Sequence, residues 1–108
     1  MASEQRIQKL KELLEKNPND SFSRYALALE YMGMSDLQTA IDELEQLIQS
    51  DPNYLAAYHQ LGQIYGKLNR TQEAKRVYRK GIDLAQELGE EKEAKEMREE
   101  LEELEDEW

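Results

Sequence analysis

The sequence contains no cysteine, only two prolines and a single histidine in 108 residues. Without cysteine the chain can form neither a disulfide nor a thiolate metal site, and such a composition is typical of intracellular proteins, so we expect a cytoplasmic location. One histidine without cysteine also falls short of the usual zinc sites. From these absences we expect no metal and no cofactor.

Long apolar runs are absent as well. No stretch of eighteen apolar residues occurs, so the sequence predicts no membrane span and no membrane partner. Residues 1–8 lack a basic start followed by an apolar block, so we expect no secretory signal.

The charge of the chain is strongly one-sided, with a formal net value of −10. Residues 90–108 hold eleven acidic and three basic side chains, a balance of −8, and the remaining thirteen acidic and eleven basic side chains give −2. The one dense basic group has no aromatic side chains placed for base stacking; it consists of Lys67, Arg70, Lys75, Arg76, Arg79 and Lys80. We therefore expect no nucleic-acid partner.

Apolar residues recur at three- and four-residue steps along most of the chain, which predicts amphipathic helices. The expected helices cover about residues 4–16, 21–32, 36–49, 54–68, 70–88 and 90–107, with the end of the fifth the least defined boundary. Two capping boxes are expected, Ser35 with Gln38 before the third helix and Asn69 with Gln72 before the fifth. The last helix is mostly charged and keeps one narrow apolar stripe, formed by Ala94, Met97, Leu101, Leu104 and Trp108.

Two segments of the chain carry the same spaced letters at an offset of 34 residues. The matches are Pro18 with Pro52, Asn19 with Asn53, Leu27 with Leu61, Tyr31 with Tyr65, and Ala40 with Ala74. A period of this length is typical of a helix–turn–helix unit that stacks on copies of itself, because one such unit cannot bury its apolar face alone.

The later segment reads Tyr58-x2-Leu61-Gly62-x2-Tyr65 and then Ala74-x3-Tyr78, and the earlier one reads Leu27-Ala28-x2-Tyr31 and then Ala40-x3-Leu44. These letters resemble the tetratricopeptide repeat pattern. The resemblance implies an all-α fold of about six helices, in which antiparallel helix–turn–helix repeats stack as a short right-handed superhelix. It places all the residues just quoted in the repeat core.

The resemblance also implies the organisation of a single domain over residues 1–108. Residues 1–17 form an N-terminal half-repeat helix, residues 18–51 and 52–88 form two repeats, and residues 89–108 form an acidic C-terminal capping helix. Alternatively, this last helix is an extended first helix of a further unit. Arg24 departs from the pattern because the family has a large aromatic residue there, so we expect the arginine stem, Tyr25 or Phe22 to replace that contact.

No catalytic constellation is present in the sequence. His59 has no serine or threonine placed beside it to act as a nucleophile, and the glutamates of the last helix are read as a solvated face. We therefore expect the chain not to be an enzyme.

The resemblance implies that the first helix of each repeat lines a peptide-binding groove. The groove residues would be Phe22, Tyr25, Leu29, Met32, His59 and Gln63. The expected function is a scaffold or adaptor that binds a peptide or helix of a protein partner. Two alternatives remain open: the first helix or a loop covers these side chains, or the groove or a stack end joins two copies of the chain into a homodimer.

One subgroup of the family clamps the C-terminal carboxylate of heat-shock chaperones with cationic side chains and asparagines. The corresponding positions are Tyr25, Leu29, Ala56 and Gln60, and none of them is cationic. We expect no binding of such a tail.

Overall fold

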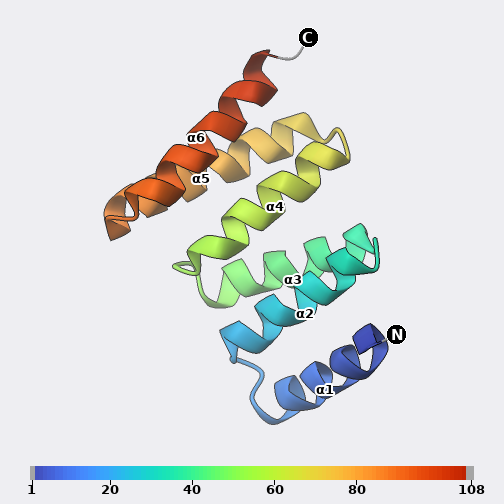
Figure 1. The fold of residues 1–108 in the computed structure, drawn as a ribbon. Coiled ribbons are helices and arrows are strands. Elements are labelled where there is room, and N and C mark those ends of the chain that lie inside the picture. Colours follow the sequence, from blue (N-terminus) through green and yellow to red (C-terminus); the bar gives the residue numbers. More distant parts are fainter. Residues whose placement is uncertain (1, 107–108) are drawn as a thin grey trace. The chain divides into compact units, whose positions relative to one another are not determined.

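The structure is a computed structural model that describes residues 2–106, with side chains from residue 4 onward. Within this range the chain forms six α-helices and no strand, which confirms the all-α class (Figure 1). The helices are α1 (Ala2–Lys16), α2 (Ser21–Gly33), α3 (Leu37–Ser50), α4 (Leu55–Lys67), α5 (Thr71–Leu88) and α6 (Glu91–Asp106). Each bound lies within two residues of its sequence prediction, and α5 does continue to Leu88.

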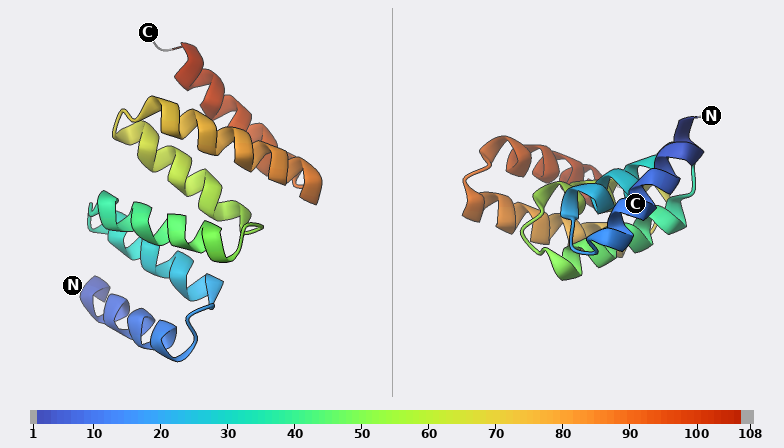
Figure 2. Two further views of the ribbon diagram at one scale, coloured as in Figure 1. Left: turned by 180° about the vertical axis from the view of Figure 1, so that it is seen from behind. Right: turned by 90° about the horizontal axis from the view of Figure 1, so that it is seen from below.

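The chain divides into two compact units, which we call unit 1 (Met1–Tyr54) and unit 2 (Leu55–Trp108). In unit 1, α2 packs against both α1 and α3, and in unit 2, α5 packs against both α4 and α6. Figure 2 shows these consecutive helices lying side by side in each unit. Within the described residues, no helix is long and apolar enough to cross a bilayer.

The 34-residue period is visible in backbone hydrogen bonds. In the α2–α3 turn the amide of Asp36 donates to the carbonyl of Tyr31 over 2.9 Å. In the α4–α5 turn the amide of Arg70 donates to the carbonyl of Tyr65, also over 2.9 Å. Each pair is shifted from the other by 34 positions. The two hairpins therefore turn in the same way, although most of their side chains differ.

The two predicted capping boxes are wrong. Ser35 and Asn69 do not precede their helices as caps, because both adopt the left-handed conformation, with φ values of 62° and 60°. The N-cap of α3 is Asp36, whose carboxylate accepts the amide of Thr39 over 3.2 Å. The equivalent N-cap of α5 is Arg70, and its side chain makes no capping hydrogen bond.

The Pro-Asn segments are also equivalent in the structure. The amide of Asp20 donates to the carbonyl of Asn17, and the amide of Tyr54 donates to the carbonyl of Asp51, both over 3.1 Å. Proline disfavours a continuing helix, so each pair marks the point where one hairpin ends and the next helix starts.

Each unit buries its own set of apolar side chains. In unit 1 the set is Ile7, Leu14, Leu27, Ala28, Ala40, Ile41, Leu44 and Leu47. In unit 2 it is Ala57, Tyr58, Leu61, Ile64, Tyr65, Ala74, Val77, Tyr78, Ile82, Leu84, Ala85, Ala94 and Met97, with Gly62 buried among them. A fully buried Leu, Ile or Met side chain stabilises the fold by about 1.5–3 kcal/mol.

One predicted core position, Tyr31, differs from the sequence expectation in its degree of burial. Tyr31 is only partly buried and packs against the cluster of Ile7, Leu14 and Leu27. Trp108, which the sequence places on the apolar stripe of the last helix, lies outside the described residues.

Arg24 occupies the aromatic position of the first repeat as a largely buried cation. Its side chain is 12% exposed, and Nη1 donates to Glu43 on α3 over 2.7 Å. The equivalent residue in unit 2 is Tyr58, which is buried. In unit 1 an arginine stem and an ion pair thus stand where unit 2 has an aromatic ring.

Helices α4 and α5 pack tightly at Gly62. A Cβ atom at this position would lie 2.7 Å from Cε1 of the Tyr78 ring, which is shorter than real Cβ contacts. The equivalent pair in unit 1 is Ala28 and Leu44, both buried. Unit 1 therefore has the methyl group of Ala28 where unit 2 has only a hydrogen at Gly62. It has the smaller Leu44 side chain where unit 2 has the Tyr78 ring.

Candidate interaction surfaces on α2 and α4

Four of the six predicted groove residues lie on α2 of unit 1. Phe22, Tyr25, Leu29 and Met32 are spaced at three- and four-residue steps and form what we call the α2 face. Phe22 is 71% exposed and Leu29 is 38% exposed, whereas Tyr25 and Met32 are partly buried. Helix α1 therefore leaves Phe22 open to solvent.

Tyr25 is held in place by a second ring. Its centroid lies 5.3 Å from that of Tyr54, with the ring planes tilted by 45°, a geometry that favours aromatic attraction. Burial raises the pKa of the Tyr54 hydroxyl, and nearby Tyr25 and Asp51 raise it further. Tyr54 thus stays neutral at physiological pH, and the α2 face has a fixed aromatic edge.

A hollow lies between α1 and α2 beside Phe22. Its volume is about 280 Å³, slightly below the range of about 300–1,000 Å³ that is usual for small-molecule sites. It is lined by Arg6, Lys9, Leu10, Leu13, Phe22, Ala26 and Glu30. Arg6 forms an ion pair with Glu30 over 3.4 Å and remains largely exposed. The hollow has an apolar floor and a largely cationic rim, and it matches one or two apolar side chains in size.

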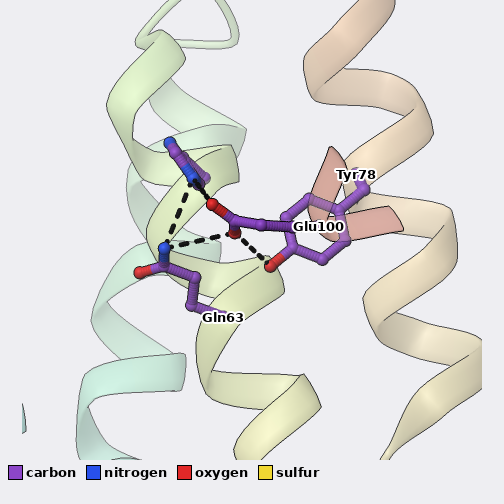
Figure 3. A network of polar contacts seen from close by, with 4 residues as sticks. Gln63, Tyr78 and Glu100 are labelled. Atoms are coloured by element: carbon purple, nitrogen blue, oxygen red, sulfur yellow. Dashed lines mark hydrogen bonds and ion pairs between the residues drawn. The ribbon is translucent and has the colours of Figure 1, made fainter. Parts of the chain in front are cut away.

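The other two predicted groove residues, His59 and Gln63, lie on α4 of unit 2. Both form hydrogen bonds with Glu100 of α6 (Figure 3). The His59 ring donates through Nε2 to one carboxylate oxygen over 2.8 Å. The other oxygen accepts from Gln63 over 3.2 Å and from the Tyr78 hydroxyl over 2.7 Å. We call these four residues the Glu100 network.

The hydrogen bonds determine the charge state of this network. Burial on its own would raise the pKa of Glu100, but the hydrogen bonds from His59, Tyr78 and Gln63 outweigh burial and lower it. Burial, together with the hydrogen bond to Glu100, strongly raises the pKa of the Tyr78 hydroxyl. At neutral pH the network therefore contains an ionised carboxylate and a protonated phenol, and it joins α4, α5 and α6.

Unit 2 has a hollow next to this network. Its volume is about 390 Å³, and it is lined by Gln63, Gly66, Lys67, Tyr78, Glu100, Glu103 and Leu104. Most of these side chains are polar or charged, in contrast to the floor of the unit 1 hollow. The residues predicted to line the groove thus lie on a partly exposed apolar surface in unit 1 and in a polar network in unit 2.

Glu100 is the residue that the sequence interpretation missed. The sequence interpretation treats it as one of many solvated carboxylates on the last helix. A signal was available, because Glu100 lies three residues after Met97 and four before Leu104, and so shares the apolar stripe of α6. The sequence did not reveal which residues of α4 and α5 it would meet.

Comparison with known proteins identifies a family match and several similar proteins. A tetratricopeptide repeat family model matches residues 1–104. The solution structure of a tetratricopeptide repeat domain protein from Salinibacter ruber is 35% identical, with a TM-score of 0.77, over 82% of this chain and 89% of that chain. The TPR2B domain of yeast Sti1, solved as a complex with pHsp70, shares the fold at 16% identity, with a TM-score of 0.84, over 91% of this chain and 78% of that chain.

A curated relative is the small glutamine-rich tetratricopeptide repeat-containing protein 2 of Mycosarcoma maydis. It is 37% identical over 73 residues, which is 66% of this chain and 20% of that protein. The chain therefore spans about a fifth of the length of the curated relative that it matches.

Proposed function

Because the chain belongs to the tetratricopeptide repeat family, we propose that it is a non-catalytic adaptor that binds a segment of a partner protein on the α2 face of unit 1. Domains of this family are typically interaction modules rather than catalysts. The proposal goes further than this family property, because it names the surface and the chemistry of the bound segment.

The exposure of Phe22 is the observation that carries the proposal. A phenylalanine that is 71% exposed beside an apolar hollow leaves a large apolar surface in water. Covering it contributes roughly 1.5–3 kcal/mol to binding, a substantial part of a micromolar affinity of about 8 kcal/mol. Leu29, about two turns further along α2, extends the same surface.

The charged side chains that line the hollow indicate which residues a partner segment should carry. Arg6 and Lys9 flank the hollow, and among the side chains that the structure describes Arg6 forms an ion pair with Glu30 whereas Lys9 forms none. The best partner segment carries one or two apolar side chains for the hollow and a neighbouring acidic residue for Lys9. Exposed ion pairs of this kind add only about 0.2–1 kcal/mol, so they select the partner more than they strengthen its binding.

His59 and Gln63 remain part of the proposal in a different role. Because both side chains bind Glu100, the surface around them in unit 2 is polar and not apolar. We propose that the apolar contacts on the α2 face supply the affinity and that any contact at His59 and Gln63 is secondary.

Selection from a displayed library of random peptides on the immobilised protein tests this proposal. We expect enriched peptides that combine aromatic or aliphatic residues with Asp or Glu. They should lose binding to Phe22→Ser and keep binding to Leu88→Ser, which changes an apolar side chain that is 46% exposed on α5. Failure to enrich any peptide, or equal binding to both variants, would contradict the proposal.

Self-association is the second candidate function. The exposed side chains of Leu13 and Phe22 favour it, because a second copy of the chain could cover them equally well. Sedimentation equilibrium separates the two functions: a concentration-dependent dimer that Phe22→Ser abolishes supports self-association, and a monomer at high concentration leaves the α2 face free for another protein.

A further inference from the structure

Three side chains with metal-binding atoms meet between α4 and α6 of unit 2. One ligand atom from each of His59, Glu93 and Glu96 lies within 4.8 Å of the other two. All three residues are partly buried. Among the described residues, the side chains of Glu93 and Glu96 form no hydrogen bond or ion pair. Two carboxylates of α6 thus lie close to the histidine of α4.

We propose that unit 2 binds one divalent transition-metal ion at His59, Glu93 and Glu96, with a ring nitrogen and two carboxylate oxygens as its ligands. A mixed set of imidazole and carboxylates suits Zn²⁺ and its first-row neighbours. Ca²⁺ and Mg²⁺ prefer oxygen ligands alone, and in larger number. The expectation of no metal rests on the absence of cysteine, the single histidine and the interpretation of the last helix's glutamates as solvated, and none of these shows which carboxylates pack against His59.

The hydrogen bond of His59 to Glu100 supports a role as a ligand. Histidines that bind metals usually donate their other ring N–H to a carboxylate, which fixes the ring and makes the free nitrogen more basic. Here Nε2 lies 2.8 Å from an oxygen of Glu100, so the proposal assigns Nδ1 of the neutral ring as the nitrogen that binds the ion. Glu100 is itself oriented by Tyr78 and Gln63. The supporting shell of a metal ligand is therefore already in place.

The spacing of the glutamates fits the same interpretation. Glu93 and Glu96 are three residues apart on α6 and so project from one side of the helix. A tetrahedral zinc site with bonds of about 2.1 Å separates its ligand atoms by about 3.4 Å. The present separations of up to 4.8 Å require movements of about 1 Å, which partly exposed glutamate side chains make by changing rotamer. The ion would link α6 to α4, with water in the fourth position.

Zn²⁺ titration of protein purified without a histidine tag tests the site. The chain has one histidine, so its ring signals in a proton NMR spectrum report on His59 alone. We expect binding of one Zn²⁺ per chain by calorimetry and a shift of the His59 signals. In Glu93→Gln/Glu96→Gln the affinity should fall by at least about tenfold. These two side chains are not in the core, so the variant is expected to fold, and its circular dichroism spectrum checks this.

The matched control is Glu99→Gln/Glu102→Gln, which removes the same charge from exposed positions of the same helix. It should bind Zn²⁺ like the wild type. Equal losses in both variants, no loss in either, or several ions per chain would overturn the proposal, because the acidic helix would then only attract cations in general. A His59 shift caused equally by Mg²⁺ would overturn it as well.

Discussion

Helices α2 and α4 occupy the same place in two repeats, yet they present different chemistry. Tyr25 and Leu29 of α2 correspond to His59 and Gln63 of α4 at the 34-residue offset. The first pair forms an apolar surface that is partly open to solvent, and the second pair binds a carboxylate from α6. The turns of the two hairpins are alike, so the repeat determines the backbone and leaves the outer faces free to diverge.

The cores differ more subtly than the faces. Unit 2 combines Gly62 with the large ring of Tyr78, and unit 1 combines Ala28 with the smaller Leu44. Cores tolerate such exchanges when the total volume is conserved. In each hairpin, a smaller residue at one position is thus combined with a larger residue at the other.

The largest effect is expected at the repeated tyrosine. Tyr65 is 1% exposed, so Tyr65→Ala should destabilise the protein by about 3–5 kcal/mol, as large-to-small changes in cores do. Tyr31 stands at the same repeat position but is only partly buried, so Tyr31→Ala should cost about 1–2 kcal/mol. Urea unfolding of both variants measures the difference. Equal losses would mean that the two units are packed alike at this position.

Gly62→Ala should have the next largest effect. The added methyl group would overlap the Tyr78 ring, which its hydrogen bond to Glu100 holds in place, and overpacking of this kind costs about 1–3 kcal/mol. Gly62→Ala/Tyr78→Leu reproduces the pair found in unit 1, and it should lose less than the sum of the two single variants. Strict additivity in thermal or urea unfolding would show that the two positions do not share one space.

Removal of one hydroxyl should have a smaller effect. Tyr78→Phe keeps the ring and deletes a 2.7 Å hydrogen bond to a carboxylate that is partly exposed, so we expect a loss of about 1 kcal/mol. The His59 ring should remain bound to Glu100, which the NMR signals of the single histidine can follow. A loss of 3 kcal/mol or more would indicate that the Glu100 network behaves as one unit.

Phe22→Ala should have the smallest effect on stability. A side chain that is 71% exposed contributes little to the fold, so the free energy of unfolding should change by no more than about 0.5 kcal/mol. Urea unfolding beside Tyr65→Ala gives the comparison within one experiment. A large loss would show that Phe22 is covered in solution.

The sequence predicted the helices well because three independent signals agree: apolar spacing, Pro-Asn breaks and the 34-residue period. It misassigned the caps because Ser35 and Asn69 are good capping residues in composition, whereas the backbone uses them in the left-handed conformation. A cap and a left-handed turn residue have the same chemical preferences, so only the backbone path distinguishes them.

The candidate sites were less predictable than the helices. The position of Phe22 on an outer face follows from helical spacing, but its degree of exposure depends on how α1 packs. Glu93, Glu96 and Glu100 meet His59 across 34, 37 and 41 positions of sequence, and a single sequence contains no signal for pairings over such separations. Local periodicity shows which residues share one face of a helix. Tertiary packing determines which residues of other helices that face contacts.

Exchanging the two outer faces tests the central claim most directly. Tyr25→His/Leu29→Gln gives α2 the side chains of α4, and its affinity for a peptide selected by the wild type can be measured by calorimetry. We predict a loss of at least about tenfold, or 1.4 kcal/mol. The control Leu68→Gln/Leu88→Gln, at exposed apolar positions of unit 2, should bind like the wild type. Unchanged affinity in the exchanged, folded variant would contradict the assignment of binding to the α2 face.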